Sequence, residues 1–256
     1  MRTNYHTHTV RCHHAAGTER EFIEAAIAEG ITELGFSDHS PYPFPDGHVS
    51  GFRMLPEETA EYFETLRALR EEYADRITIH IGFEAEYYPA FFEAMREHVR
   101  AHGCEYLILG QHFLYNEVEK VYSGAATDEE ARLAQYVDQV LEGLATGAYT
   151  YLAHPDLVTW TGSEEVYRQQ MLRLCRGVKE LDIPLEINLL GLYEGRQYPA
   201  ERFWRIAAEC GCDAVIGVDA HEPEALHRTE TANKALELAQ RCGIRVLERP
   251  KVLRRP

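Results

Sequence analysis

The amino-acid sequence predicts an α/β protein in which helices cover a parallel sheet. Short apolar runs alternate with amphipathic stretches about seven times along the chain. Because parallel neighbours in a sheet need crossover connections, this alternation is typical of repeated strand–helix units. The chain has 256 residues and no interior linker rich in Gly, Ser or Pro. We therefore expect residues 1–256 to form a single domain.

Each apolar run is predicted to form a strand. The strands are expected near residues 3–8, 32–38, 77–86, 105–111, 149–154, 184–189 and 213–218. A last short run, 244–248, is either an eighth strand or a tail. Since crossover connections are right-handed, the chain either closes into a barrel or opens into a doubly wound sheet.

The helices between the strands begin at capping signals. Thr18 and Glu21 form a capping box, and Gly30 is placed to end that helix. Pro56 opens a second helix. Further helices are expected over 127–146, where Thr127 and Glu130 form another capping box, and over 164–181, 199–210 and 223–241.

One stretch, residues 40–55, has three prolines and two glycines and no periodicity. It follows a predicted strand, so in a barrel it lies at the edge where active sites form. It is either a loop that faces the substrate or a loop that faces solvent.

Charge and composition restrict the possible partners. The formal net charge of -16 argues against nucleic acid and anionic membranes, because both require an excess of Lys and Arg. Residues 1–10 do not resemble a signal peptide, and no apolar run approaches the ~20 residues of a membrane span. The six cysteines are therefore expected to be reduced thiols of a cytoplasmic protein. The sequence does not indicate an oligomeric state.

The thirteen histidines are the unusual feature of the composition, and many of them stand at the ends of predicted strands. In parallel α/β folds the carboxyl ends of the strands form the functional site. Side chains two residues apart in a strand share a face, so His6 and His8 can reach one ion. Glu84 and Asp219 follow apolar strands, where burial makes a counter-charge necessary. The candidate ligands are His6, His8, His14, His39, Glu84, His112, His154, Asp219 and His221.

These nine side chains are too many for one ion and fit two or three. A mixed set of imidazoles and carboxylates suits Zn, Mn or Fe. Metal ions close together activate water and stabilise an in-line displacement at phosphorus, which favours phosphoester hydrolysis. Hydrolysis of amides or lactones is the competing chemistry.

The runs YHTHTVRCHH, FSDHSP, GFEAEY, GQHF, AHPD, EINLLG and GVDAH resemble the polymerase and histidinol phosphatase (PHP) superfamily. The resemblance extends from residue 4 to about residue 221 and is to the histidinol-phosphatase branch. It implies a distorted (β/α)7 barrel of the TIM-like kind and a trinuclear metal centre. The family spacing selects His14 over His13.

The same resemblance implies how the ligands are shared. One metal would take His6, His8, Glu84 and Asp219, a second Glu84, His112 and His154, and a third His14, His39 and His221. A metal-bridging hydroxide held by Glu84 and Asp219 would be the catalytic group.

For substrate phosphate, the resemblance implies an arginine after the sixth strand. Arg196 is the candidate there, displaced along the run GLYEGRQYP, and Arg11 is a second candidate. Asn188 ends that strand and is placed to touch substrate. Glu86 is expected either to orient a ligand or substrate ammonium or to face water, and Asp38 and Asp156 are expected to accept hydrogen bonds beside ligands.

Three functions follow as hypotheses. The first is a metal-dependent phosphomonoesterase that converts L-histidinol phosphate and water to L-histidinol and phosphate, in histidine biosynthesis. The second is a phosphoesterase of the same kind that acts on nucleotides or another small phosphate ester. The third is a non-catalytic, metal-binding regulatory module that needs a partner protein.

Overall fold

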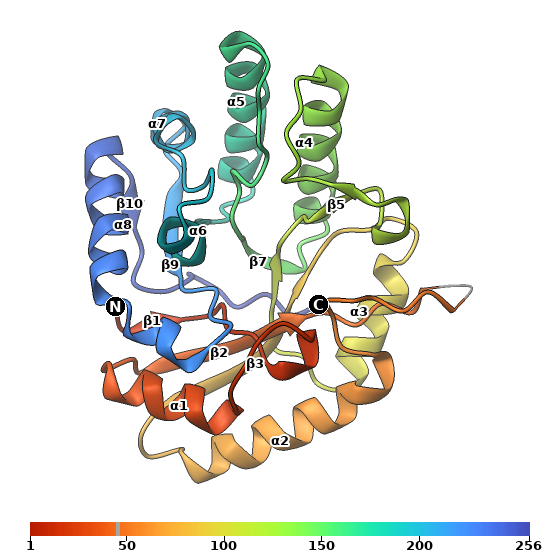
Figure 1. Ribbon diagram of the computed structural model, residues 1–256, viewed down its shortest axis with the longest axis vertical. Coiled ribbons are helices and arrows are strands. Elements are labelled where there is room, and N and C mark those ends of the chain that lie inside the picture. Colours follow the sequence, from red (N-terminus) through yellow and green to blue (C-terminus); the bar gives the residue numbers. More distant parts are fainter. Residues whose placement is uncertain (45–46) are drawn as a thin grey trace.

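The computed structural model describes residues 1–44 and 47–256 and has one parallel sheet at its centre (Figure 1). Its strands are hydrogen-bonded in the order β1-β2-β3-β4-β7-β8-β9-β10. Their bounds are β1 Thr3–Asn4, β2 Glu33–His39, β3 Thr78–Ala85, β4 Leu107–Leu109, β7 Tyr149–Leu152, β8 Leu185–Asn188, β9 Asp213–Gly217 and β10 Arg245–Val246. The α/β class with a distorted TIM-like barrel is thus confirmed, and run 244–248 is an eighth strand.

The sheet curls until its first and last parts meet. Thr7 and Ala220 form a parallel bridge, in which the His8 amide donates to the Ala220 carbonyl at 2.9 Å and the Ala220 amide to the His6 carbonyl at 3.1 Å. At the other end of the barrel, β10 pairs with the start of β9 instead. The barrel is distorted because it closes only at the carboxyl ends of its strands.

The helices lie outside the sheet and around its curve (Figure 1). Their bounds are α1 Glu19–Ala28, α2 Thr59–Glu72, α3 Phe92–Ala101, α4 Glu130–Ala145, α5 Glu164–Glu180, α6 Leu189–Glu194, α7 Glu201–Glu209 and α8 Thr229–Cys242. Among the described residues, no helix is both long and apolar enough to cross a bilayer.

The sequence prediction differs from the structure in several local elements. The capping box predicted at Thr127 and Glu130 is wrong: α4 begins at Glu130, and the Thr127 hydroxyl accepts from the Glu129 amide before the helix starts. A small antiparallel hairpin, β5 Phe113–Leu114 and β6 Val121–Tyr122, was not predicted, nor was α6. The predicted helix 223–241 begins as a 3-10 turn, Pro223–His227, before α8. These segments are too short to show periodicity.

A cluster of tyrosines fills the barrel interior beneath the carboxyl ends of the strands. Tyr5, Tyr106 and Tyr151 are buried together there with small aliphatic residues. The Tyr106 hydroxyl lies 2.9 Å from the Tyr5 carbonyl and 3.1 Å from that of Phe36. Since buried hydroxyls need hydrogen-bond partners, this arrangement gives the site above it a rigid floor.

The capping box of α1 supplies a test of the local structure. The Thr18 hydroxyl accepts from the Glu21 amide at 3.3 Å, and the Thr18 amide donates to the Glu21 carboxylate at 2.7 Å. Thr18→Ala should cost about 1 kcal/mol and lower Tm by roughly 2–4 °C, measured by thermal unfolding. Thr161→Ala, at an exposed threonine outside any helix, is the control. An equal loss in both variants would contradict the assignment of the cap.

Candidate metal centre

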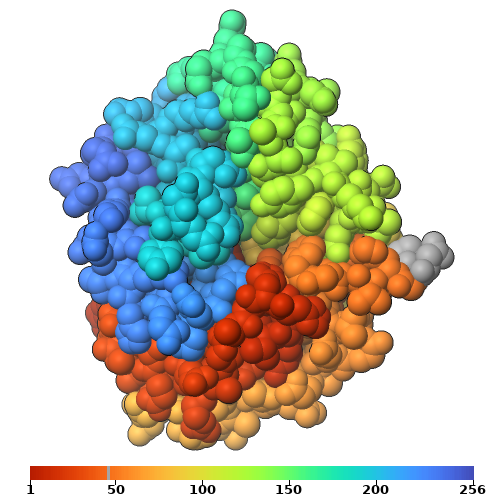
Figure 2. Space-filling view, in the orientation of Figure 1, coloured from red at the N-terminus to blue at the C-terminus, as the bar shows by residue number. Residues whose placement is uncertain are grey.

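The strand-end histidines and acids meet in a pocket at the closed end of the barrel. Its volume is about 460 Å³. In the space-filling view, the segments that carry these residues converge at a hollow near the centre of the face (Figure 2). The pocket is lined by seven of the candidate ligands, namely His14, His39, Glu84, His112, His154, Asp219 and His221.

Glu84 stands at the centre of this group, at the end of β3. Its Oε2 lies 3.5 Å from His6 Nε2, 3.6 Å from His8 Nε2 and 3.1 Å from His39 Nδ1. The carboxylate is 1% exposed, so solvent cannot compensate its charge. One oxygen therefore faces three imidazoles.

The other oxygen of Glu84 faces a different pair of histidines. Oε1 lies 2.8 Å from His154 Nε2 and 3.5 Å from His112 Nε2. A carboxylate with separate ligand partners on each oxygen is placed to bridge two ions.

Asp219, in the segment after β9, completes the first group. Its Oδ1 is 3.5 Å from His6 Nε2 and 3.2 Å from His8 Nε2. Its Oδ2 is held by the amide of Asn188 at 3.0 Å. His6, His8 and Asp219 thus form one possible metal-binding group, and Glu84, His112 and His154 form another.

The chemistry and spacing of these atoms fit metal ions. His6 Nε2, His8 Nε2, His39 Nδ1 and Asp219 Oδ1 are buried and have no hydrogen-bond partner. Buried polar atoms without partners are rare because each costs free energy. Ligands at 2.0–2.1 Å from a tetrahedral zinc ion are about 3.3 Å apart, which matches the 3.2–3.6 Å distances around His6 and His8.

A third group lies nearer the surface. His14, His39 and His221 have ring nitrogens close enough to hold one ion, and His14 Nε2 is 2.9 Å from His221 Nε2. The Nδ1 of His14 contacts the Cys12 carbonyl at 2.7 Å, which fixes the ring. His14, and not its neighbour His13, is the histidine that joins this group.

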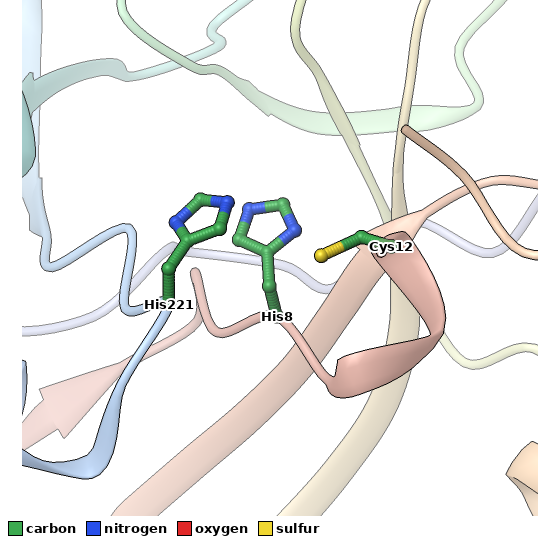
Figure 3. Close-up of side chains that lie close together, drawn as sticks. All are labelled: His8, Cys12 and His221. Carbon is green, nitrogen blue, oxygen red and sulfur yellow. The ribbon is translucent and has the colours of Figure 1, made fainter. Parts of the chain in front are cut away.

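Cys12 also lies near these histidines. Figure 3 shows the stacked rings of His8 and His221, with the sulfur of Cys12 beside His8. Burial raises the pKa of the Cys12 thiol, so the sulfur stays protonated at neutral pH. The Cys12 sulfur nevertheless lies close enough to the ring nitrogens of His8 and His221 to form a further possible metal-binding group with them.

Carboxylates behind the ligands hold the imidazoles in place. Glu186 of β8 is 2.8 Å from His6 Nδ1 and also accepts from the amide of His154 at 3.0 Å. Glu86 is 3.0 Å from His112 Nδ1. Acceptors at Nδ1 leave Nε2 free to bind metal. The sequence predicts that Glu86 either orients a ligand or substrate ammonium or faces water, and in the structure its carboxylate contacts the candidate ligand His112.

Asp38 and Asp156, the two other acids near ligands in the sequence, differ in the groups that they contact. Asp38 lies 3.5 Å from His8 Nδ1, and it also accepts from the Thr9 amide at 3.2 Å. Asp156 accepts from the amide of Ala200 at 2.6 Å and contacts no ligand side chain. Burial raises the pKa of Asp156 to about 7.

Residues 47–55 contact Glu86, one of the carboxylates behind the ligands, and also contribute to the lining of the pocket. Arg53 is 1% exposed, and its guanidinium donates to Glu86 at 3.0 Å, to Glu117 at 2.9 Å and to the Ser40 carbonyl at 2.8 Å. Phe52, next to it, lines the pocket. In the described part of 40–55, Gly51 and Phe52 face the pocket and Arg53 is buried, whereas Pro43, Gly47 and Val49 face solvent. Positions 45 and 46 lie outside the described residues.

Two ligands have an unusual backbone conformation. His154 has φ 28° and Asp219 has φ 55°, both in the left-handed region that most residues avoid. Gly110 and Gly217 allow close approach of the carboxylates: a Cβ on Gly110 would lie 1.8 Å from Glu84 Oε1, and one on Gly217 would lie 1.8 Å from Glu186 Oε1. The local backbone is thus adapted to the positions of these groups.

The pKa values reflect this crowding. Burial alone would raise the pKa of Glu84 and Asp219, yet the surrounding imidazoles hold both well below the usual range. Burial alone would lower the pKa of His8, but Asp219 and Asp38 raise it to about 9. Burial and the neighbouring His8 lower the pKa of His221 to about 3. The carboxylates remain anionic, so the site needs positive charge from protons or from metal ions.

The described residues of the pocket lining also include three aromatic rings and an arginine. Phe52, Phe113 and Tyr122 supply these rings, with centroids of adjacent pairs 5.7 Å apart. Arg196 lies at the rim, paired with Glu194 at 2.6 Å and donating to the Tyr198 hydroxyl at 2.8 Å. Sequence reasoning found Arg196 but not the aromatic residues, which carried no motif.

Two predicted substrate residues are not brought to the pocket. Arg11 donates to Glu61 at 2.8 Å and is also paired with Glu19, so its guanidinium is engaged outside the pocket lining. The Asn188 amide nitrogen donates to Glu186 and Asp219, each at 3.0 Å, and its oxygen accepts from the Gly191 amide at 2.9 Å. Asn188 therefore supports the carboxylates of Glu186 and Asp219, and it is not among the residues that line the pocket.

A first prediction concerns the space beside Glu84. Gly110→Ala forces the Glu84 carboxylate away from His112 and His154, because the new methyl group would overlap Oε1. We expect the purified protein to carry less metal, measured by elemental analysis. Gly51→Ala, where an added Cβ meets nothing within 4 Å, is the matched control. Equal metal content in both variants would show that Glu84 is not a ligand.

A second prediction concerns Glu186. Glu186→Gln keeps the shape of the side chain but removes the charge beside His6 Nδ1. Loss of such a supporting carboxylate typically weakens metal binding by roughly 10- to 100-fold. Competition with a chelator measures the affinity. Glu209→Gln, on an exposed pair with Arg168, should leave the affinity unchanged.

Comparison with known proteins identifies the family of the chain. The PHP domain family model matches residues 4–189. The chain is 30% identical over 227 residues to a probable histidinol-phosphatase of Deinococcus radiodurans, covering 85% of each chain. It is 26% identical over 250 residues to histidinol-phosphatase of Bacillus subtilis, covering 85% of this chain and 92% of that one.

A solved structure has a similar fold. The histidinol phosphate phosphatase of Lactococcus lactis, crystallised with zinc, L-histidinol and phosphate, has a TM-score of 0.73 at 19% identity, over 96% of this chain and 95% of that one. The family match covers most of the chain and includes the first strand, the Glu84 strand and the His112 and His154 turns. The chain belongs to the PHP domain family.

Proposed function

We propose that residues 1–256 act as a single metal-dependent catalytic domain that hydrolyses a small phosphate monoester, namely L-histidinol phosphate, to L-histidinol and phosphate. The observation that carries this proposal is the arrangement around Glu84. Its two oxygens face separate sets of buried imidazoles whose nitrogens lack other partners, beside a pocket with an arginine at its rim.

The proposed cofactors are two or three divalent ions of zinc, manganese or iron. The groups at His6, His8 and Asp219, at Glu84, His112 and His154, and at His14, His39 and His221 would hold them. Such ions lower the pKa of water and draw charge from phosphoryl oxygens. We propose that Glu84 and Asp219 would hold the ions that activate the attacking water.

The protein's own groups have separate roles toward the substrate. Arg196 is the proposed phosphate-binding side chain, because its planar guanidinium can donate two hydrogen bonds to one phosphate. The aromatic wall of Phe52, Phe113 and Tyr122 would pack against the organic part of the ester. The 460 Å³ pocket has room for a small molecule.

The names of the related proteins support the choice of substrate. The relatives from Deinococcus radiodurans and Bacillus subtilis are both named as histidinol-phosphatases. A different ester remains the alternative for the same site. A structure of metal-dependent tyrosine phosphatases shares the fold with a TM-score of 0.53 at 14% identity, so the fold itself accepts more than one substrate.

A phosphate-release screen tests the proposal. The metal content of the purified chain is measured first, and the loaded protein is then offered L-histidinol phosphate, nucleoside monophosphates and phosphotyrosine. We expect L-histidinol phosphate to have the highest kcat/KM. A higher kcat/KM with another ester would identify that ester as the substrate in place of L-histidinol phosphate. If the isolated, metal-loaded chain hydrolysed none of these esters, the result would favour a regulatory module.

The ligand set gives the matching mutational prediction. His6→Ala and Asp219→Ala each remove a buried atom that has no other partner, so we expect turnover to fall by orders of magnitude. His227→Ala, at an exposed histidine paired with Glu29, is the control and should retain activity. Either site variant working near the wild-type rate would refute the proposed centre.

A further inference from the structure

Tyr198 is a pocket residue that no part of the proposed mechanism uses. It follows α6 and precedes α7, it is 2% exposed, and it lines the same pocket as His154 and Asp219. Its ring centroid lies 5.8 Å from that of His154. The side chain therefore stands directly beside the candidate metal centre.

The hydrogen bonding of Tyr198 leaves its proton free. Its hydroxyl oxygen accepts from Arg196 Nη1 at 2.8 Å. Among residues 1–44 and 47–256, no acceptor is present for the hydroxyl proton. Buried hydroxyl groups normally use both functions, so this donor is available to an acceptor bound in the pocket.

The position of the ring is firmly defined. A Cβ on Gly191 of α6 would lie 2.4 Å from the ring atom Cε2, so the ring occupies the space that this glycine leaves. On either side in the chain, the Gln197 side chain donates to the Leu157 carbonyl, and the Ala200 amide donates to Asp156. A donor held this way needs no reorganisation when a ligand binds.

The charge state of the phenol is also fixed. A tyrosine hydroxyl has an ordinary pKa of about 10, and burial of the side chain favours its neutral form. The group is therefore a neutral donor at physiological pH. A neutral donor beside a guanidinium matches an anion with several acceptor oxygens, such as a phosphoryl group.

We propose that Tyr198 is a catalytic residue whose hydroxyl donates a hydrogen bond to a non-bridging phosphoryl oxygen of the substrate, in the same anion-binding unit as Arg196. This assignment rests on the proposed phosphoesterase function. As the bond from water oxygen to phosphorus forms, the bond from phosphorus to the alcohol oxygen breaks. Of the two water protons, one stays on the phosphate and the other ends on the alcohol, while Tyr198 keeps its own proton. It stabilises the charge on the phosphoryl oxygens and does not protonate the leaving group.

Tyr198→Phe tests the assignment, since it keeps the ring in the space beside Gly191 and removes only the hydroxyl. We expect kcat/KM to fall by about 10²-fold, the usual effect of losing one such donor. The fall should be equal for L-histidinol phosphate and for p-nitrophenyl phosphate, which has a good leaving group. A loss confined to L-histidinol phosphate would overturn the proposal, because it would identify Tyr198 as the proton donor to the leaving alcohol.

Binding of inorganic phosphate to the metal-loaded protein gives a readout that does not depend on turnover. Titration calorimetry should show weaker phosphate binding by Tyr198→Phe, with unchanged metal content. Unchanged phosphate affinity would overturn the proposal, and so would loss of metal, since the hydroxyl would then support the centre itself. The control is Tyr73→Phe, which removes a hydroxyl bonded to Glu24 at 2.7 Å on the outer helices.

The two proposals can fail separately. A wild-type chain that leaves L-histidinol phosphate intact refutes the proposed substrate. In that case, two measurements on Tyr198→Phe still decide the role of Tyr198: turnover of p-nitrophenyl phosphate and binding of inorganic phosphate.

Discussion

The buried carboxylate of Glu84 is the constraint on which the rest of the site depends. An ionised carboxylate that is 1% exposed costs several kcal/mol unless positive charge compensates it. The five surrounding imidazoles come from the ends of four different strands, and both oxygens of Glu84 contact them. Cations are the simplest solution, because they satisfy the carboxylate and the unpartnered imidazole nitrogens at once.

The ligands could be predicted from the sequence because strand geometry determines where they point. Residues two apart in an extended segment share a face, so His6 and His8 both reach the site although regular pairing stops at Asn4. The carboxyl ends of parallel strands meet at one end of a barrel, which brings His39, Glu84 and His154 together. No detail of packing was needed for that inference.

The supporting residues could not be found in the same way. Arg53 comes from an aperiodic segment, and only the folded chain shows that its guanidinium lies between Glu86 and Glu117. Glu186 stands two residues before Asn188, and its role behind His6 depends on the missing side chain of Gly217. Arg11 has the right sequence position for a phosphate ligand but is engaged by Glu61 and Glu19. Which neighbouring group each of these side chains contacts depends on the folded structure, and the sequence pattern alone does not determine it.

The same reasoning explains why the site sits where the barrel closes. The first strand and the segment after β9 are joined by the bridge between Thr7 and Ala220, and the candidate ligands His6, His8, Asp219 and His221 flank this bridge directly. Ions bound there would connect the two ends of the barrel through side chains, in parallel with the two backbone hydrogen bonds. A ligand that binds only the closed form stabilises it by mass action, so metal binding and barrel closure are thermodynamically linked. The distortion at the opposite end, where β10 occupies the edge of β9, does not weaken that linkage, because the metal groups lie entirely at the closed end.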